Sequence, residues 1–220
     1  MTGTRPDRFH LIESEMVTLD FADELEFAEG DGLEVLGNGA VPTDDGNLVR
    51  RAMRATGRTA YIRLRKRIPV GGGLGGGSAD AAAVLRWAGV TDLRVAASLG
   101  ADVPFCLLGG RARVGGIGEI VEPLPFEDRV FTLLTPPFGV STPAVYRAWD
   151  DMGGPRSEGP NDLEPAAVRV EPRLVEWRDR LAEATGRTPV LAGSGATWFV
   201  EGAFEGTDLV QARTRPAEDT

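Results

Sequence analysis

Residues 66–85 combine a basic residue, a run of glycines and a stretch of small residues, a pattern that could bind phosphate. Six glycines lie between positions 71 and 77, interrupted by Leu74, and Ser78 follows them. Glycine permits backbone torsions that other residues avoid and lets an anion approach the main chain closely. Because a helix is expected to begin here, its free N–H groups and positive end would face the anion. The pattern therefore predicts a phosphate-binding loop.

The segment is not the common Gly-x-x-x-x-Gly-Lys-Ser/Thr loop, which the sequence lacks. It resembles instead the second motif of the GHMP kinases, Pro-x-x-x-Gly-Leu-Gly followed by small residues, here Pro69, Gly73, Leu74 and Gly75. The extended form that ends in Asp80 resembles more narrowly the 4-diphosphocytidyl-2-C-methyl-D-erythritol kinases. Further blocks follow in that family's order, at residues 47–49, 100–105, 118–119, 139–142, 161–164 and 193–197.

The resemblance implies an α/β fold of two domains. Residues 1–124 would form the ATP-binding domain, similar to the second domain of ribosomal protein S5, and residues 125–220 a ferredoxin-like domain. The implied reaction transfers the γ-phosphoryl group of ATP to the 2-hydroxyl of 4-diphosphocytidyl-2-C-methyl-D-erythritol, a step of isoprenoid precursor synthesis. Mg²⁺ would bridge the phosphates.

Two segments are implied to bind ATP, namely the glycine loop and a turn that resembles the third superfamily motif and backs the loop. The expected ATP-binding residues are Lys66, Pro69, Val70, Gly71, Gly72, Gly73, Leu74, Gly75, Gly76, Gly77, Ser78, Ala79, Gly193, Ser194 and Gly195. For the last three, an ordinary tight turn is the alternative interpretation.

Asp102 is the candidate catalytic residue. In the family that the chain resembles, the aspartate of Gly-Ala-Asp-Val-Pro-Phe lies beside the acceptor hydroxyl, where a carboxylate can accept its proton. The alternative is that Asp102 caps a turn before Pro104, as aspartate often does.

Phe9, His10 and Thr142 are the expected substrate-binding residues. The family places a tyrosine and a histidine in the cytidine pocket, and this chain has Phe9 where tyrosine is usual and Arg8 where glycine is usual. Stacking on a base uses the ring face and tolerates the first change, whereas the second is harder to accommodate. His10 is the only histidine and has no second ligand beside it, so no protein metal site is expected.

One family motif is not found in this sequence. The family carries an early strand Ala-Lys-x-Asn-Leu, whose lysine supports the acceptor and the transferring phosphoryl group, whereas Lys66 is the only lysine here. Three hypotheses follow: a kinase whose start lies upstream, with poor activity as written; a catalytically impaired ATP-binding relative acting as a binding or regulatory module; or another GHMP kinase of homoserine or mevalonate type.

The composition limits the remaining classes of function. A net charge of −9 disfavours general nucleic-acid binding, and the eight basic residues between Arg50 and Arg67 are interpreted mainly as solvated faces. Cys106 is the only cysteine, so no intrachain disulfide can form, and it is expected in the core. No apolar run approaches the ~20 residues of a membrane span, and a cytoplasmic location is expected.

Hydrophobic periodicity predicts the elements that would position these residues. Strands are expected within 16–27, at 33–36, 111–114 and 130–134, and a hairpin is expected from 189–192 and 197–200. Helices are expected at 47–55, 79–87, 93–99 and 174–184.

Overall fold

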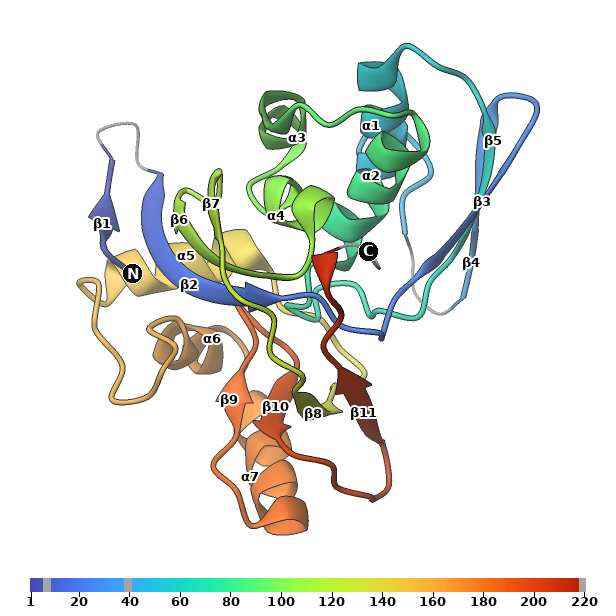
Figure 1. Cartoon of the computed structure of the whole chain (residues 1–220). Helices are drawn as coiled ribbons and strands as arrows, with labels where there is room; N and C mark the ends of the chain where they lie inside the picture. Colours follow the sequence, from blue (N-terminus) through green and yellow to red (C-terminus); the bar gives the residue numbers. More distant parts are fainter. Residues whose placement is uncertain (6–8, 38–40, 218–220) are drawn as a thin grey trace. The chain divides into compact units, whose positions relative to one another are not determined.

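The computed structural model describes residues 1–5, 9–37 and 41–217, and its chain forms two compact units (Figure 1). Unit 1 comprises Met1–Ile68, Gly75–Asp128 and Thr214–Thr220, and unit 2 comprises Pro69–Leu74 and Arg129–Arg213. The chain passes to the second unit at Arg129, four residues after the expected domain boundary, and returns to the first unit at its end. The boundary between residues 124 and 125 stays a prediction.

The described residues of unit 1 form two sheets. The first has the order β1 (Gly3–Thr4), β2 (His10–Val17), β6 (Arg111–Gly116) and β7 (Ile120–Pro123), all antiparallel. The second has β5 (Tyr61–Arg65) between antiparallel β3 (Glu24–Ala28) and parallel β4 (Gly32–Leu36). The helices are α1 (Leu48–Thr56), α2 (Gly76–Trp87), α3 (Leu93–Leu99) and α4 (Val103–Leu108).

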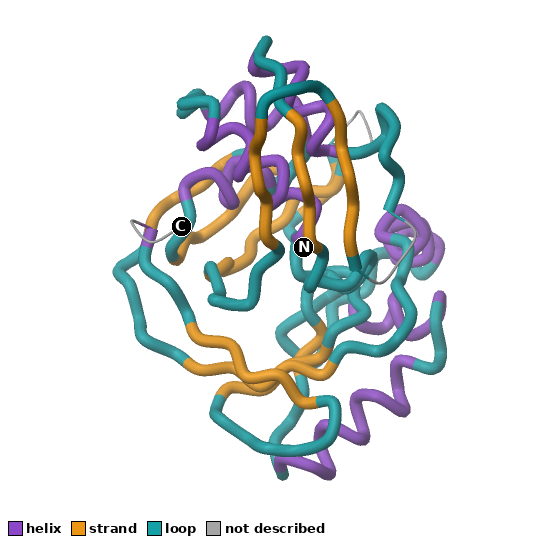
Figure 2. The backbone as a smooth tube through the Cα atoms, turned by 90° about the vertical axis from the view of Figure 1, so that its right-hand side faces the viewer, coloured by secondary structure: helices purple, strands orange, loops and turns teal. Residues whose placement is uncertain are grey.

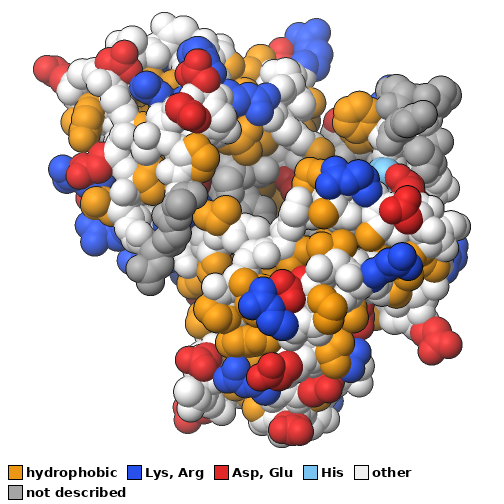
Figure 3. Space-filling model, turned by 180° about the vertical axis from the view of Figure 1, so that it is seen from behind, with side chains coloured by type: hydrophobic (Ala, Val, Ile, Leu, Met, Phe, Trp, Pro, Cys, Tyr) orange, Lys and Arg blue, Asp and Glu red, His pale blue; other side chains and the backbone are white. Residues whose placement is uncertain are grey.

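The core of unit 1 forms where strand β5 and helices α1 and α2 bury their apolar residues together. In β5, Ile62 and Leu64 are buried, whereas Arg63 and Arg65 are exposed and pair with glutamates. This alternation is typical of a half-buried strand. Figure 3 likewise shows basic and acidic side chains interspersed over the face that it presents. The basic residues of β5 therefore lie on a solvated, charge-balanced face, as the sequence indicated.

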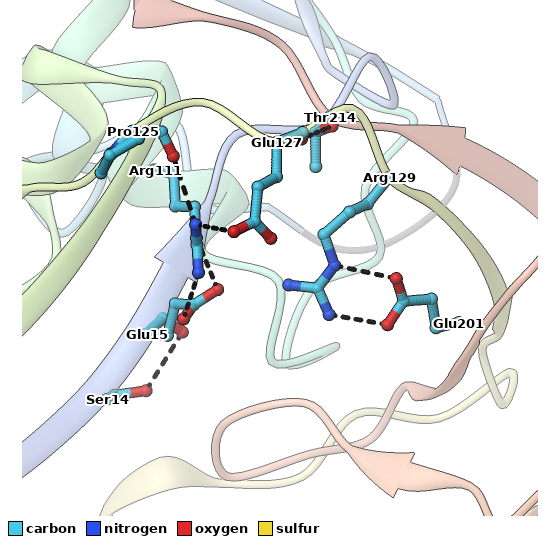
Figure 4. A network of polar contacts seen from close by, with 8 residues as sticks. All are labelled: Ser14, Glu15, Arg111, Pro125, Glu127, Arg129, Glu201 and Thr214. Carbon is cyan, nitrogen blue, oxygen red and sulfur yellow. Dashed lines mark hydrogen bonds and ion pairs between the residues drawn. The ribbon is translucent and has the colours of Figure 1, made fainter.

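Arg111 of β6 connects the first sheet to the segment that leaves it (Figure 4). Its guanidinium donates to Glu15 of β2 at 2.9 Å and 3.1 Å and to the Pro125 carbonyl at 3.2 Å, and it also pairs with Glu127. Thr214 donates its hydroxyl to the Glu127 carbonyl at 2.8 Å. The returning end of the chain is thereby fixed to unit 1.

Unit 2 is one antiparallel sheet with three helices. The strand order is β11 (Leu209–Arg213), β8 (Val130–Leu134), β10 (Trp198–Glu201) and β9 (Val190–Leu191), drawn in orange in Figure 2. The helices are α5 (Thr142–Asp151), α6 (Glu164–Val170) and α7 (Leu174–Thr185), and α7 packs against β10. In the described residues, no helix combines the length and apolar composition that a membrane crossing needs.

Most of the predicted elements are confirmed, including the four helices and the hairpin β9–β10. The prediction of strands within 16–27 is wrong for residues 18–23, because β2 ends at Val17 and β3 begins at Glu24. Thr18 still donates its N–H to the Gly110 carbonyl, but Gly110 N donates to the Thr18 hydroxyl instead of its carbonyl, and Leu19 forms only an isolated bridge with Thr214. Helices α4, α5 and α6, strands β1, β7 and β11, and residues 10–15 of β2 were not predicted.

Candidate active site

The first part of the glycine loop, residues 69–74, follows a path that only glycine tolerates. Gly71 has a φ of +70° and Gly73 a φ of +76°, both in the left-handed region that disfavours side chains. The N–H of Gly72 donates to the Pro69 carbonyl at 3.1 Å, which closes a turn. Val70 is 54% exposed at the start of this turn.

Two other segments of unit 2 pack directly on this turn. The Gly71 carbonyl accepts hydrogen bonds from Val140 N at 3.1 Å and Ala196 N at 3.0 Å, and the Gly72 carbonyl accepts one from Thr197 N at 2.9 Å. A Cβ on Gly73 would lie 2.1 Å from the Ala192 carbonyl oxygen, so no side chain fits there. Three motifs that are distant in the sequence, at residues 71–73, 139–140 and 193–197, therefore meet. Residues 193–197 therefore back the loop, and the ATP contacts expected of Gly193, Ser194 and Gly195 stay a prediction.

Asn161 holds the third motif in place. Its side-chain amide donates to the Gly193 carbonyl at 2.7 Å and the Leu191 carbonyl at 2.9 Å, and its Oδ1 accepts from Leu163 N. The resembling block at 161–164 was recognised in the sequence, but this role was not. Thr142 and Ser194 are joined by a hydrogen bond of 2.8 Å between their hydroxyls. The structure thus brings together one expected substrate-binding residue and one expected ATP-binding residue.

Helix α2 begins directly after Gly75, with an N-terminus that no side chain caps. Gly75 is the N-cap with a φ of +67°, no side chain caps the helix, and its first turn contains no acidic residue. The first hydrogen bond of the helix runs from Ala79 N to the Gly75 carbonyl at 2.9 Å, so the N–H groups of Gly76, Gly77 and Ser78 lie at its open end. Such an end attracts an anion through its free donors and dipole. The helix starts three residues before the predicted start at residue 79, because Gly76, Gly77 and Ser78 are part of it.

Lys66 is buried in unit 1. Its Nζ donates to Asp80 Oδ2 at 2.9 Å and to Asp23 Oδ2. Burial raises the pKa of Asp80, and the ammonium group of Lys66 opposes that rise. The phosphate contact expected of Lys66 stays a prediction, and Asp23 had not been singled out in the sequence, because it lies 43 residues away from Lys66.

Asp102 stands directly before helix α4, at the N-cap position, yet its side chain makes no capping hydrogen bond. In the described part of the chain, its carboxylate has no hydrogen-bond or ion-pair partner, and burial raises its pKa. A half-buried carboxylate that does not serve a cap can accept a proton from a substrate. The neighbouring Cys106 packs against the core as expected, and burial raises the pKa of its thiol to about 12.

Gly118 supports the backbone next to Asp102. It lies in the turn between β6 and β7 with a φ of +126°, and a Cβ there would come within 2.6 Å of the Ala101 carbonyl oxygen. The turn therefore touches the residue that precedes Asp102. The Gly-Glu block at this place was noted in the sequence, but only the tertiary contact shows what the glycine does.

Gly118→Val should lower turnover about 10- to 100-fold while leaving ATP binding within about 2-fold, because displacing Ala101 shifts Asp102. Gly115→Ala in the same hairpin is the matched control, since its Cβ would meet nothing closer than 3.9 Å. Steady-state kinetics with ATP titrations would check both variants. Equal effects of the two substitutions would show that Gly118 has no special role in placing Asp102.

Phe9 and His10 lie at the beginning of strand β2. The Phe9 ring is 56% exposed, and His10 is half-buried and pairs in register with Thr4 of β1. Arg8, the other departure noted in the sequence, lies outside the described residues. The role of Phe9 and His10 in binding substrate stays a prediction.

The chain is similar to proteins of one superfamily. Residues 47–110 match the family "GHMP kinases N terminal domain". A solved 4-(cytidine 5'-diphospho)-2C-methyl-D-erythritol kinase matches this chain with a TM-score of 0.73 and 32% sequence identity. The match covers 96% of this chain and 92% of the solved chain. A homoserine kinase from Cytophaga hutchinsonii has a TM-score of 0.57 at 20% identity, covering 86% of this chain and 79% of its own, which shows a shared fold alone. The fold is the two-domain α/β fold of the GHMP kinases.

Similarity within that class is concentrated in one family. The "4-diphosphocytidyl-2-C-methyl-D-erythritol kinase" of Paracoccus denitrificans is 38% identical, covering 96% of this chain and 85% of its own length. The protein of the same name from Pelotomaculum thermopropionicum is also 38% identical, covering 99% of this chain and 90% of its own. The chain belongs to the 4-diphosphocytidyl-2-C-methyl-D-erythritol kinase family.

Proposed function

We propose that this chain is an ATP-dependent kinase that phosphorylates the 2-hydroxyl of 4-diphosphocytidyl-2-C-methyl-D-erythritol, for isoprenoid precursor synthesis. Family membership supports the reaction. The observation that carries the site is the uncapped N-terminus of α2, where the N–H groups of residues 76–78 are open to an anion. The glycine loop directly precedes it in the chain and is backed, within unit 2, by residues 139–140 and 193–197. Free backbone donors at a helix N-terminus suit phosphate oxygens.

In this proposal the chain mainly positions its substrates. Phosphoryl transfer needs little covalent assistance, so catalysis depends on alignment and on stabilising the charge of the transferring group. The loop and the first N–H groups of α2 hold the phosphate oxygens, with Ser78 in the first turn. Asp102 accepts the proton of the acceptor hydroxyl as its oxygen bonds to phosphorus.

The finer assignments belong to the same proposal. Mg²⁺ would accompany ATP and would neutralise negative charge on its phosphates. Phe9 would stack on the cytosine ring, and His10 and Thr142 would make polar contacts with the substrate. The cytoplasmic location expected from the sequence stays a prediction.

The pH dependence should report on Asp102. A general base must be ionised, and burial raises the pKa of this carboxyl. Activity should therefore be present above the raised pKa and should fall as the pH drops through it. We expect the acidic limb of kcat/KM against pH to have a midpoint above the ordinary value for aspartate, about 3.9. A midpoint at or below that value would contradict the assignment.

The function is tested by incubating the chain with ATP, Mg²⁺ and each of three acceptors. Phosphate transfer to 4-diphosphocytidyl-2-C-methyl-D-erythritol is expected, with none to homoserine or mevalonate. Transfer to one of the latter would favour another GHMP kinase activity. ATP binding without any transfer would favour the second candidate function, an ATP-binding module. The intact glycine loop is consistent with that function as well.

A further inference from the structure

Lys66, Asp23 and Asp80 form a buried charged cluster where strand β5 leads into the glycine loop. Their side chains are only 6%, 2% and 5% exposed, respectively. Lys66 Nζ contacts one carboxylate oxygen of each aspartate. Charges so far from water are destabilising unless they are paired and hydrogen-bonded, which makes the arrangement sensitive to the loss of any member.

The three residues connect the two ends of the loop. Lys66 precedes the loop, Asp80 lies in the second turn of the helix that follows it, and Asp23 bridges the two. Asp23 Oδ1 also accepts hydrogen bonds from Arg67 N at 2.6 Å and Ile68 N at 2.8 Å. Ile68 lies directly against the start of α2, since a Cβ on Gly76 would come within 2.8 Å of its Cγ2. The entrance and the exit of the loop are therefore fixed to one another.

We propose that Lys66 is a positioning residue: with Asp23 and Asp80 it clamps both ends of the glycine loop and does not itself contact the phosphates of ATP. Its ammonium group is already occupied by two buried carboxylates. Turning it toward a ligand would leave those carboxylates facing each other without a cation. Asp80 Oδ1 has no partner in the described residues even now, so Asp80 depends on Lys66 for its pairing.

The inference rests on the proposed function, because the clamp affects ATP only if the loop binds it. Asp80→Ala separates the two roles of Lys66, since it removes the clamp at the helix end but keeps the ammonium group. We expect the Kd for ATP to rise about 10-fold and hydrogen exchange of residues 66–80 to accelerate without ATP. A direct phosphate ligand freed from Asp80 would instead bind ATP equally well or more tightly, which would overturn the proposal.

A second pair of variants gives an independent test. Lys66→Met should weaken ATP binding about 10-fold or more at pH 8 and lower the melting temperature, because two carboxylates remain buried together. Adding Asp80→Asn should restore both properties to within about 3-fold of the original Kd, because the new amide can donate to Asp23. If the double variant regains stability but not ATP affinity, Lys66 contacts the phosphates and the clamp proposal is wrong.

Arg65→Met is the matched control. Arg65 is the basic residue directly before Lys66, but its side chain is 54% exposed, and its ion pair with Glu24 is 3.6 Å long. Such an exposed ion pair contributes little to stability, so the ATP affinity and the melting temperature of Arg65→Met should stay unchanged. Losses as large as those of Lys66→Met would argue against the clamp. If the original chain binds no ATP at all, the proposed function fails. The clamp is then still tested by the melting temperatures alone: Lys66→Met should lower the melting temperature, and adding Asp80→Asn should restore it.

Discussion

Asp102→Asn should lower kcat by about 10²-fold or more while the affinities for ATP and for 4-diphosphocytidyl-2-C-methyl-D-erythritol remain near their original values. The substitution keeps the shape of the side chain but removes the proton acceptor. Folding should be little affected, because the Asp102 side chain caps no helix and pairs with no described residue. Steady-state kinetics and separate ligand titrations would distinguish chemistry from binding.

Asp92→Asn is a suitable control for this prediction. Asp92 also precedes a helix of unit 1, but its carboxylate does cap, accepting from Arg94 N at 2.9 Å. We expect this variant to change stability slightly and turnover hardly at all. Unchanged turnover in Asp102→Asn would assign Asp102 a structural role and remove the proposed base.

Gly75→Val should raise the Kd for ATP about 10- to 100-fold. Gly75 has a φ of +67°, and a Cβ there would meet nothing within 4 Å, so the effect comes from backbone strain rather than from a clash. A β-branched residue in the left-handed region costs roughly 1–3 kcal/mol and would be relieved by moving the first turn of α2. The N–H groups that we propose as phosphate donors would then lose their alignment.

Gly89→Val provides the matched comparison at the other end of the same helix. Gly89 has a φ of +75° and equally open space, so the backbone strain should be similar. Both variants should therefore lose comparable thermal stability, but only Gly75→Val should lose ATP affinity in a binding titration. If both bind ATP as the original chain does, the start of α2 is not the phosphate site.

The predicted elements succeeded where local patterns were strong. Asn47 caps α1 through a hydrogen bond to Val49 N, and Gly57 ends it in the left-handed conformation, so both boundaries were readable in the sequence. Helix α4 was missed because its six residues, beginning with Val103 and Pro104, are too short to show a period. Strand β11 was missed because its pairing residues in β8 lie 75 to 83 positions earlier in the chain.

The glycine loop and the helix that follows it could be predicted from the sequence alone, because glycine's torsional freedom and the start of a helix are local properties that need no distant partner. The sequence also identified Asp102 by its motif, although not the support from Gly118. The surroundings of these residues depend on tertiary contacts, namely the backing of the loop by residues 139–140 and 193–197 and the burial of Lys66 between Asp23 and Asp80. A lysine beside a glycine loop is locally indistinguishable from a phosphate ligand. Its actual partners depend on burial and on a carboxylate brought from 43 residues away, and neither is encoded in local spacing.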